Sequence, residues 1–495
     1  MYDYNTNQSL CAFPWTHNYS GPRYTRKLCC TSDDVEGLDK TTEEEYLNSP
    51  ELKQIRLDML AGKKIPQCHN CYKVEDMGLE SMRRNSFRLG LSEKDNEFDK
   101  YVEQTLPDGT TFLKPIYYDN RTIHCNLQCV SCGPTFSSEH INLFKKMHGT
   151  LDGKEAGHTD AGGHTNRTDH SFVVDKEHEE IFSKEFIEGL EEKRIRSIYW
   201  AGGEPFMSVV HWEVMDRMLE LREEPGYEEY IDGIRIHYNT NMTRATWKGK
   251  PIAELLKPYK NLYVEASLDG SHETFEWTRD GANWDKCIAN YKSFLDAGID
   301  TKLTCVMSGP VILDFDRYMD FFEQDAFTPN GFIELSFHRI MANSHAGFEF
   351  TTGQYNGLDP CFYPEEIIIP ACKRAIERLK KSKKVNNPEF NMRWEGASSK
   401  FFDQHLIQRT KSNIGILQYY IDDKIKNKER YDDLDALIEA KTNTTYRDKF
   451  HKTTNLLDTL YVSNREAYDW YNKLNYIIDQ KVPPLHPGTI DYVEI

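Results

Sequence analysis

Apolar and polar positions follow two different rhythms between residues 114 and 338. Short apolar, β-prone runs have the period of a strand, and longer amphipathic stretches between them have the period of a helix. This succession predicts an α/β fold with parallel strands, whose ligands lie at the carboxyl ends of the strands. The six predicted strands cover residues 114–123, 196–200, 234–241, 262–270, 301–307 and 332–338. The predicted helices among them cover residues 135–147, 211–222, 284–297 and 312–322.

The pattern differs on both sides of this succession. A chain of 495 residues is too long for one compact core. We therefore expect an N-terminal region with a linker over residues 1–112, a strand–helix region over 113–345 and a helical region over 346–495. The predicted C-terminal helices cover residues 364–384, 399–411, 414–426, 431–441 and 463–482. The proline-rich stretch after residue 482 is expected to be a surface tail.

Composition narrows the class of protein. A hydrophobic content of 39% and an aromatic content of 12% are typical of globular proteins, and the net charge of −18 argues against a nucleic-acid-binding surface. No run of eighteen apolar residues exists, so we expect no transmembrane helix. The first residues lack the basic and apolar parts of a signal peptide. Twelve cysteines without an export signal therefore predict a reducing compartment, the cytoplasm.

Three cysteines follow the first predicted strand, at Cys125, Cys129 and Cys132. An odd trio makes a poor disulfide framework. Three thiolates on one short loop can bind zinc if a fourth ligand joins them. They can instead hold three irons of a [4Fe–4S] cube and leave the fourth iron open. The ligand pattern favours iron–sulfur, and zinc remains the alternative.

A second motif, Gly202-Gly203-Glu204, follows the second predicted strand. Two glycines allow a ligand to approach the backbone closely, and a carboxylate can accept hydrogen bonds from a bound ammonium group. Taken alone, the sequence is better explained by a structural turn. Its position one β/α unit after the cysteines favours a ligand site.

Together the two motifs resemble the radical S-adenosylmethionine (radical SAM) superfamily, whose signature is Cys-x3-Cys-x2-Cys after the first barrel strand and Gly-Gly-Glu after the second. The resemblance implies a partial (β/α)6 barrel with a [4Fe–4S] cluster on Cys125, Cys129 and Cys132, whose open iron binds the amino and carboxylate groups of SAM. It implies that one electron, from a donor such as flavodoxin or ferredoxin, cleaves SAM to methionine and a 5′-deoxyadenosyl radical that abstracts hydrogen from substrate. The chain departs from the family at Ser131, where an aromatic residue usually packs near the adenine.

The resemblance implies further contacts with SAM. The segment beginning at Ser267 resembles one in a SPASM-associated subgroup, where this serine and a following arginine, here Arg279, contact the ribose and carboxylate of SAM. A guanidinium fork suits a carboxylate, and the alternative for Arg279 is an ion pair with Asp280 or Glu276. Asn239, at the end of the third predicted strand, is a further SAM candidate, and the alternative is a helix cap.

Cysteines also mark the N-terminal region. A short helix is predicted among them, with Ser49 as N-cap, Pro50 at its first position and Gly62 at its end. The order Cys-x-x-Pro-Trp, Cys-Cys, helix and Cys-x-x-Cys resembles the SPASM/twitch module, which in other radical SAM enzymes follows the barrel and binds an auxiliary [4Fe–4S] cluster. A structural zinc site is the alternative. The implied ligands are Cys11, Cys29, Cys68 and Cys71, with Cys30 as a spare.

Two other features have plainer explanations. The insertion over residues 149–175 contains His158, His164 and His170, but their irregular spacing favours a mobile lid over a metal site. The cysteines outside the motifs are expected to be core residues, although one of the last two can serve as a hydrogen donor. These cysteines are Cys287, Cys305, Cys361 and Cys372.

Only the resemblance indicates a class of substrate. SPASM/twitch members often modify ribosomally made peptides, so a peptide or protein is the expected substrate. A nucleotide or carbohydrate is the alternative, although the acidic net charge disfavours a polyanion. An alternative of another class is a zinc-stabilised binding protein that has lost the reaction.

Overall fold

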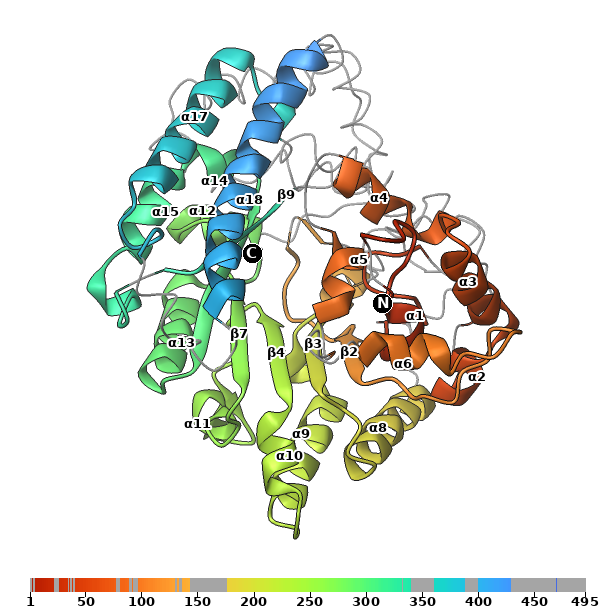
Figure 1. Cartoon of the computed structure of the whole chain (residues 1–495). Helices are drawn as coiled ribbons and strands as arrows, with labels where there is room; N and C mark the ends of the chain where they lie inside the picture. Colours follow the sequence, from red (N-terminus) through yellow and green to blue (C-terminus); the bar gives the residue numbers. More distant parts are fainter. Residues whose placement is uncertain are drawn as a thin grey trace, which may run out of the picture.

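The computed structural model shows an α/β fold built on one parallel sheet (Figure 1). The structure describes residues 2, 5–21, 26–33, 35, 38, 41–76, 81–88, 91, 97–129, 131–132, 136–142, 176–331, 333–339, 360–387, 399–428 and 469. In Figure 1, strands β7, β4, β3 and β2 stand between the N-terminal helices and the helices α17 and α18.

Seven parallel strands form this sheet in the order β1-β2-β3-β4-β7-β8-β9. The six predicted strands are all present, which confirms the parallel α/β prediction. The strands are β1 His17–Ser20, β2 Tyr117–Thr122, β3 Ser197–Gly202, β4 Arg235–Thr240, β7 Leu262–Ser267, β8 Asp300–Met307 and β9 Leu335–Arg339. A separate antiparallel pair consists of β5 Thr246–Trp247 and β6 Lys250–Pro251.

Successive side chains point to opposite faces of the sheet, and the two faces differ. The outer face carries buried side chains such as Tyr118, Ile198, Ile236, Val264 and Leu303, which join the main core with the helices. The inner face carries mostly polar residues. The helices of this region are α8 Lys176–Glu191, α9 Val209–Arg222, α10 Glu228–Gly233, α11 Ile252–Leu256, α12 His272–Thr278, α13 Trp284–Asp296, α14 Gly309–Leu313 and α15 Phe315–Phe322. Three 3-10 turns accompany them, η3 Pro205–Met207, η4 Asp325–Phe327 and η5 Pro360–Phe362.

The strand β1 joins the N-terminal region to the seven-stranded sheet. His17 pairs with Tyr117, and Ser20 pairs with Asn120, in parallel register. All four residues of β1 are buried, so the strand lacks the alternation from which the other strands are predicted. The prediction of six strands is therefore corrected to seven.

The predicted helix among the N-terminal cysteines is confirmed as α3, Pro50–Leu60. The Ser49 hydroxyl accepts a hydrogen bond from Leu52 N at 3.2 Å, and Gly62 follows the helix with a φ of +77°. The other helices of this region are α1 Phe13–Thr16, α2 Glu43–Leu47, η1 Pro66–Cys68, α4 His69–Asp76, α5 Met82–Asn85, η2 Ser86–Arg88 and α6 Glu97–Glu103.

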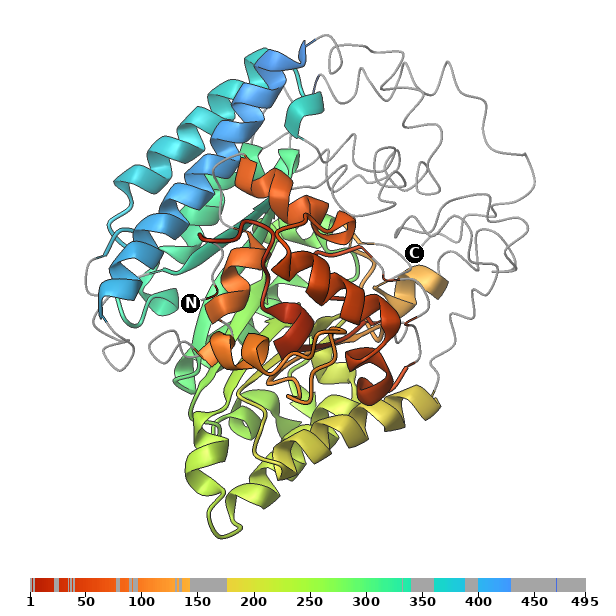
Figure 2. The same cartoon turned by 45° about the vertical axis from the view of Figure 1, so that its right-hand side comes forward.

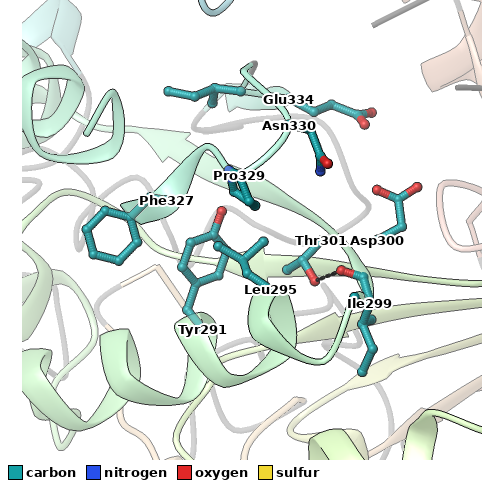
Figure 3. Close-up of a pocket in the computed structure, with 11 residues that line it drawn as sticks. Tyr291, Leu295, Ile299, Asp300, Thr301, Phe327, Pro329, Asn330 and Glu334 are labelled. Atoms are coloured by element: carbon teal, nitrogen blue, oxygen red, sulfur yellow. Dashed lines mark hydrogen bonds between the residues drawn. The ribbon is translucent and has the colours of Figure 1, made fainter. Parts of the chain in front are cut away.

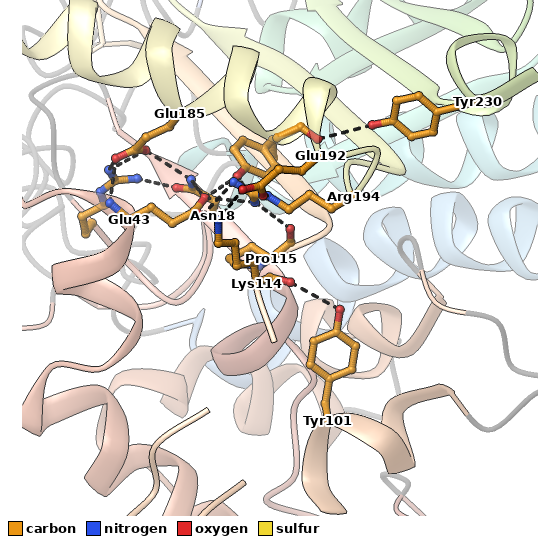
Figure 4. Close-up of polar contacts among 12 residues, drawn as sticks. Asn18, Glu43, Tyr101, Lys114, Pro115, Glu185, Glu192, Arg194 and Tyr230 are labelled. Atoms are coloured by element: carbon orange, nitrogen blue, oxygen red, sulfur yellow. Dashed lines mark hydrogen bonds and ion pairs between the residues drawn. The ribbon is translucent and has the colours of Figure 1, made fainter. Parts of the chain in front are cut away.

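Buried ion pairs fasten the N-terminal region to α8 and to the loop between α8 and β3 (Figure 4). Arg26 Nη2 lies 2.7 Å from Glu185 Oε1, and Glu43 N donates to the same oxygen at 2.6 Å. Glu43 also pairs with Arg194 at 2.9 Å. The amide of Asn18 donates to both carboxylates, at 2.6 Å to Glu43 and 3.3 Å to Glu185. The positive charges of two arginines and the negative charges of two glutamates therefore neutralise one another at this junction.

The C-terminal helices cover the far edge of the sheet. Helix α17, Glu365–Lys381, packs beside α18, Ser399–Lys426, in both views (Figure 1 and Figure 2). Helix α18 is continuous where two helices are predicted, which corrects that expectation. Its Asn413 accepts from Phe337 N and donates to Leu335 O, both at 3.0 Å, and so occupies the free edge of β9.

Some expectations fall on other parts of the chain. The insertion over 149–175, the helix over 431–441, the tail after 482 and, apart from Asp469, the helix over 463–482 lie outside the described residues. Among the described helices, none is long and apolar enough to cross a membrane.

A cavity of about 120 Å³ lies beside Tyr291 and Phe327 (Figure 3). It reaches Asp300 at the amino-terminal end of β8. Since the sheet is parallel, this is the opposite end from the cysteine loop, which follows the carboxyl end of β2. The cavity is therefore separate from the candidate site.

Candidate active site

The loop with Cys125, Cys129 and Cys132 begins directly after β2 and is fixed by the residues that follow it. The Ser137 hydroxyl donates to Leu127 O at 2.8 Å. The Ser138 hydroxyl accepts from Cys125 N at 3.1 Å and donates to Cys125 O at 2.9 Å. These hydrogen bonds come from residues that follow the three cysteines, and they fix the backbone of the loop.

The three thiols share one small cluster. Cys125 and Cys129 are 6% and 8% exposed, and the half-buried Cys132 packs against them. Arg279 Nη1 and Asn241 Nδ2 lie 3.9 Å from the sulfurs of Cys129 and Cys125, respectively. Burial, with the neighbouring Cys129, raises the pKa of Cys125 to about 12. A thiolate here needs a compensating cation, which metal would supply.

This donor set fits a cluster. Among the described residues, no three His, Cys, Asp or Glu side chains are placed to hold a single metal ion. The cysteine ligands of an iron–sulfur cube each bind a different iron atom, so their sulfurs lie around the cube and do not converge on a single ion. The assignment of Cys125, Cys129 and Cys132 as ligands stays a prediction.

The Gly202–Glu204 turn lies against the start of the cysteine loop. Gly203 N donates to Thr122 O at 2.6 Å, and Glu204 N donates to His124 O at 2.7 Å. Gly202 has a φ of +103°, and a Cβ at Gly202 or Gly203 would overlap the backbone of Thr122 or His124, respectively. Both positions therefore require glycine.

The Glu204 carboxylate is fully buried and bound within the protein. It accepts from Phe206 N at 3.2 Å, from Thr240 Oγ1 at 2.9 Å and from Asn241 N at 2.8 Å. Burial raises its pKa to about 7. The carboxylate thus ties the turn to the end of β4, which is the structural alternative of the sequence analysis. Its contact with the SAM ammonium stays a prediction.

Arg279 has a different ion-pair partner from those expected. Its Nη2 lies 2.9 Å from Asp269 Oδ2, so the pairing with Asp280 or Glu276 is wrong. Glu276 instead accepts from Trp284 N at 2.8 Å. In the described part of the chain, the buried Nε of Arg279 has no hydrogen-bond partner. One donor of the guanidinium next to the cysteine loop is therefore available to a ligand.

The two remaining SAM candidates lie on strands. Ser267 is the last residue of β7 and is half-buried. With its amide nitrogen as donor, Asn239 lies 3.1 Å from Glu265 Oε2 and 3.2 Å from the Tyr199 hydroxyl. These neighbours belong to β7 and β3, so the helix-cap alternative for Asn239 is wrong. A contact of Ser267 or Asn239 with SAM stays a prediction.

The implied auxiliary cysteines gather in the N-terminal region. Burial raises the pKa of Cys11, Cys29 and Cys68, and the charge of Cys71 raises each of them further. Thr31 Oγ1 lies 3.3 Å from Cys29 Sγ and 3.8 Å from Cys71 Sγ. The four thiols therefore share one electrostatic environment, although their role as ligands stays a prediction.

Cys30 has another environment from its neighbour Cys29. Burial raises the pKa of Cys30 to about 11, and the next influences on it come from Arg121 and Asp119 of β2. Cys29 is instead influenced, after burial and Cys30, by Cys71 and Cys11. Cys71 raises the pKa of both thiols, so the choice of Cys29 over Cys30 stays a prediction.

The other cysteines confirm the expectation of core positions. They are at most 2% exposed and belong to the main hydrophobic cluster. These residues are Cys287, Cys305, Cys361 and Cys372.

Sequence reasoning missed a row of rings and charges across the inner face, which we call the inner row. Arg121 lies over Tyr19 and Tyr199, 5.7 and 5.1 Å from the ring centroids. His237 stacks between Tyr199 and Tyr263, with centroids 4.4 and 4.1 Å apart. Polar residues at alternate strand positions were the available signal. The inner row consists of Tyr19, Asp119, Arg121, Tyr199, His237, Tyr263, Glu265 and Lys302.

Comparison with known proteins finds similarity to one family over the middle of the chain. The sequence model of the Radical SAM superfamily matches residues 120–322. No curated protein matches the chain. Similar solved structures include native anSMEcpe with bound AdoMet, which is 16% identical with a TM-score of 0.33 over 54% of this chain and 59% of that chain.

Streptococcus suis SuiB is also similar. SuiB bound to S-adenosylmethionine is 13% identical with a TM-score of 0.33, over 67% of this chain and 63% of that chain. SuiB bound to the precursor peptide SuiA is 15% identical with a TM-score of 0.33, over 64% and 60% of the two chains. The chain thus spans less than two thirds of the length of these structures. The match to the Radical SAM superfamily covers both motifs, the three cysteines after β2 and the Gly202–Glu204 turn after β3.

Proposed function

We propose that the protein cleaves SAM reductively at a [4Fe–4S] cluster held by Cys125, Cys129 and Cys132, and abstracts hydrogen from a peptide or protein. The observation that carries this proposal is the grouping of the three thiols beside the Gly202–Glu204 turn, within the segment that matches the family. A reduced cluster with SAM supplies a 5′-deoxyadenosyl radical. An electron donor such as flavodoxin or ferredoxin, in the cytoplasm, completes the proposal.

The chain's own residues hold and shield the reactants. Ser137 and Ser138 fix the cysteine loop, and the two glycines allow the Gly202–Glu204 turn to pack directly against the backbone of Thr122 and His124. Arg279 keeps Nε for the SAM carboxylate while Asp269 orients its other edge. Ser267 and Asn239 are proposed to contact SAM from the ends of neighbouring strands.

Replacing Cys125, Cys129 and Cys132 together with alanine tests the first part. We expect no 5′-deoxyadenosine from SAM under dithionite and an unchanged circular dichroism spectrum, because the three residues lie on a loop outside the sheet. The matched control replaces the core cysteines Cys287 and Cys305 with alanine, the same change at positions outside the loop, and should retain SAM cleavage. Continued 5′-deoxyadenosine formation by the triple variant would contradict the assignment of these cysteines as cluster ligands.

We further propose that residues 1–112 hold an auxiliary [4Fe–4S] cluster through Cys11, Cys29, Cys68 and Cys71. The reconstituted protein should bind about eight irons, and Cys29→Ala together with Cys71→Ala should lower this to about four, because the auxiliary cube would keep only two of its four ligands. The adjacent Cys30→Ala is the matched control and should keep about eight irons. One zinc and no auxiliary iron would support the structural-zinc alternative instead.

A further inference from the structure

The charges of the inner row are paired within the row. Arg121 binds Asp119 with its Nε and Nη2 at 3.1 and 3.3 Å. Lys302 pairs with Glu265, which also lies 3.1 Å from His237 Nε2. Burial lowers the pKa of His237 to about 4, so this ring is neutral near pH 7. Two cations and two carboxylates leave the row without net charge.

The rings prevent these cations from turning toward a new partner. Arg121 is confined between Tyr19 and Tyr199, and Lys302 Nζ lies 5.3 Å from the ring centroid of Tyr263. Asp119 is buried, with only 1% of its side chain exposed. An anion at the remaining Nη1 edge of Arg121 would share the guanidinium with the buried Asp119 carboxylate, whose negative charge opposes the binding of a second anion.

Part of the row is nevertheless exposed. The side chains of Arg121 and His237 are 16% and 18% exposed, and Tyr199 and Asn239 are half-buried. Arg121 stands four positions before Cys125, at the end of β2 from which the loop leaves. Arg121 therefore brings the row to the strand end from which the cysteine loop leaves, and the exposed members of the row can contact a substrate bound there.

We propose that the inner row receives an uncharged peptide amide group of the substrate, and that Asp119 and Glu265 set this specificity by neutralising Arg121 and Lys302. This inference rests on the proposed function and narrows its substrate class. The Tyr199 hydroxyl can donate and accept hydrogen bonds, as a peptide amide requires. A phosphate-bearing nucleotide or sugar would instead require a cation that is not already paired.

Calorimetric titration of the reconstituted enzyme with SAM present tests the rejection of anions, using inorganic phosphate and uridine 5′-monophosphate as probes. Wild type should bind neither probe more tightly than about 1 mM. Asp119→Asn should tighten binding by about tenfold or more, because it frees Arg121, and adding Arg121→Gln should abolish the gain. The matched control Asp58→Asn breaks an exposed pair with Lys63 and should change nothing.

Two results would overturn the anion half of the proposal. One is tight binding of either probe by wild type that Arg121→Gln removes, and the other is a folded Asp119→Asn variant that gains no affinity. If Asp119→Asn does not fold, Glu265→Gln provides the same test through Lys302.

Saturation-transfer NMR with N-acetylalanine methylamide, an uncharged peptide amide, tests the other half. Wild type should transfer magnetisation to this probe, and Tyr199→Phe should reduce the transfer at least twofold. No transfer from wild type would overturn the amide assignment. None of these binding measurements requires SAM cleavage, so loss of 5′-deoxyadenosine formation would refute the proposed function while leaving this inference to its own test.

Discussion

Asp314, at the junction of α14 and α15, retains its proton to an unusually high pH. Burial raises its pKa from 3.8 to about 6, although Thr274 Oγ1 donates to it at 2.8 Å. Between these two values the unfolded chain releases a proton that the folded protein keeps, so stability falls as pH rises through the window. Asp314→Asn keeps the acceptor and removes the titration.

We therefore expect the wild type to lose stability relative to Asp314→Asn between about pH 4 and pH 6, by up to about 3 kcal/mol. Thermal denaturation of both proteins across this range measures the difference. Asp296→Asn, which alters an exposed pair with Lys292, should give a difference that varies little with pH. A pH-independent difference for Asp314→Asn would contradict the argument.

At the same scale, Glu204 shows where sequence reasoning ends. The motif predicts that a ligand approaches the backbone at Gly202 and Gly203, but the structure places the backbone of Thr122 and His124 against these glycines, so the ligand contact stays a prediction. The partners of the carboxylate depend on Thr240 and Asn241, which the fold brings in from β4. No local pattern around Glu204 indicates them.

Among the elements, β1 and α18 differ most from expectation. Strands with one apolar and one polar face are visible in the sequence, and all six were predicted. Strand β1 is buried on both faces and finds its partner a hundred residues away, at Tyr117. Helix α18 continues through Asn413 because that side chain is bound by β9, a tertiary contact that overrides weak helix propensity.

Asn413→Ala should weaken the contact between α18 and β9. It would leave Phe337 N and Leu335 O without their side-chain partners, at a cost of about 1–3 kcal/mol for each group that stays buried. We expect a lower melting temperature and faster hydrogen exchange at Phe337. Gln418→Ala, on the exposed side of the same helix, should leave both nearly unchanged. Equal effects of the two variants would show that Asn413 does not protect this edge.

For the whole molecule, the buried pairs around α8 decide how firmly the N-terminal region is attached. Arg26→Met would leave Glu185 buried without its cation, which costs about 3–5 kcal/mol. We expect a lower melting temperature and, because β1 belongs to the same sheet, earlier exposure of the N-terminal cysteines to a thiol reagent. Alkylation with iodoacetamide, followed by mass spectrometry, measures that exposure.

The control for Arg26→Met is Lys184→Met, which breaks an ion pair within α8. Lys184 is 77% exposed and lies 3.6 Å from Glu188, so its loss should cost about 0–1 kcal/mol. Adding Glu185→Leu to Arg26→Met should restore much of the stability, because an apolar pair replaces the lone carboxylate. An Arg26→Met protein as stable as Lys184→Met would show that the pairs do not fasten the region.

The position of β1 also has a consequence for folding order. Its partner β2 lies a hundred residues later and, among the strands that the structure describes, is its one neighbour in the sheet. During synthesis from the N-terminus, β1 is therefore made well before any strand with which it can pair. Such distant pairing is slow because a long loop must close first. With four residues, β1 leaves few backbone groups exposed to intermolecular pairing during this interval.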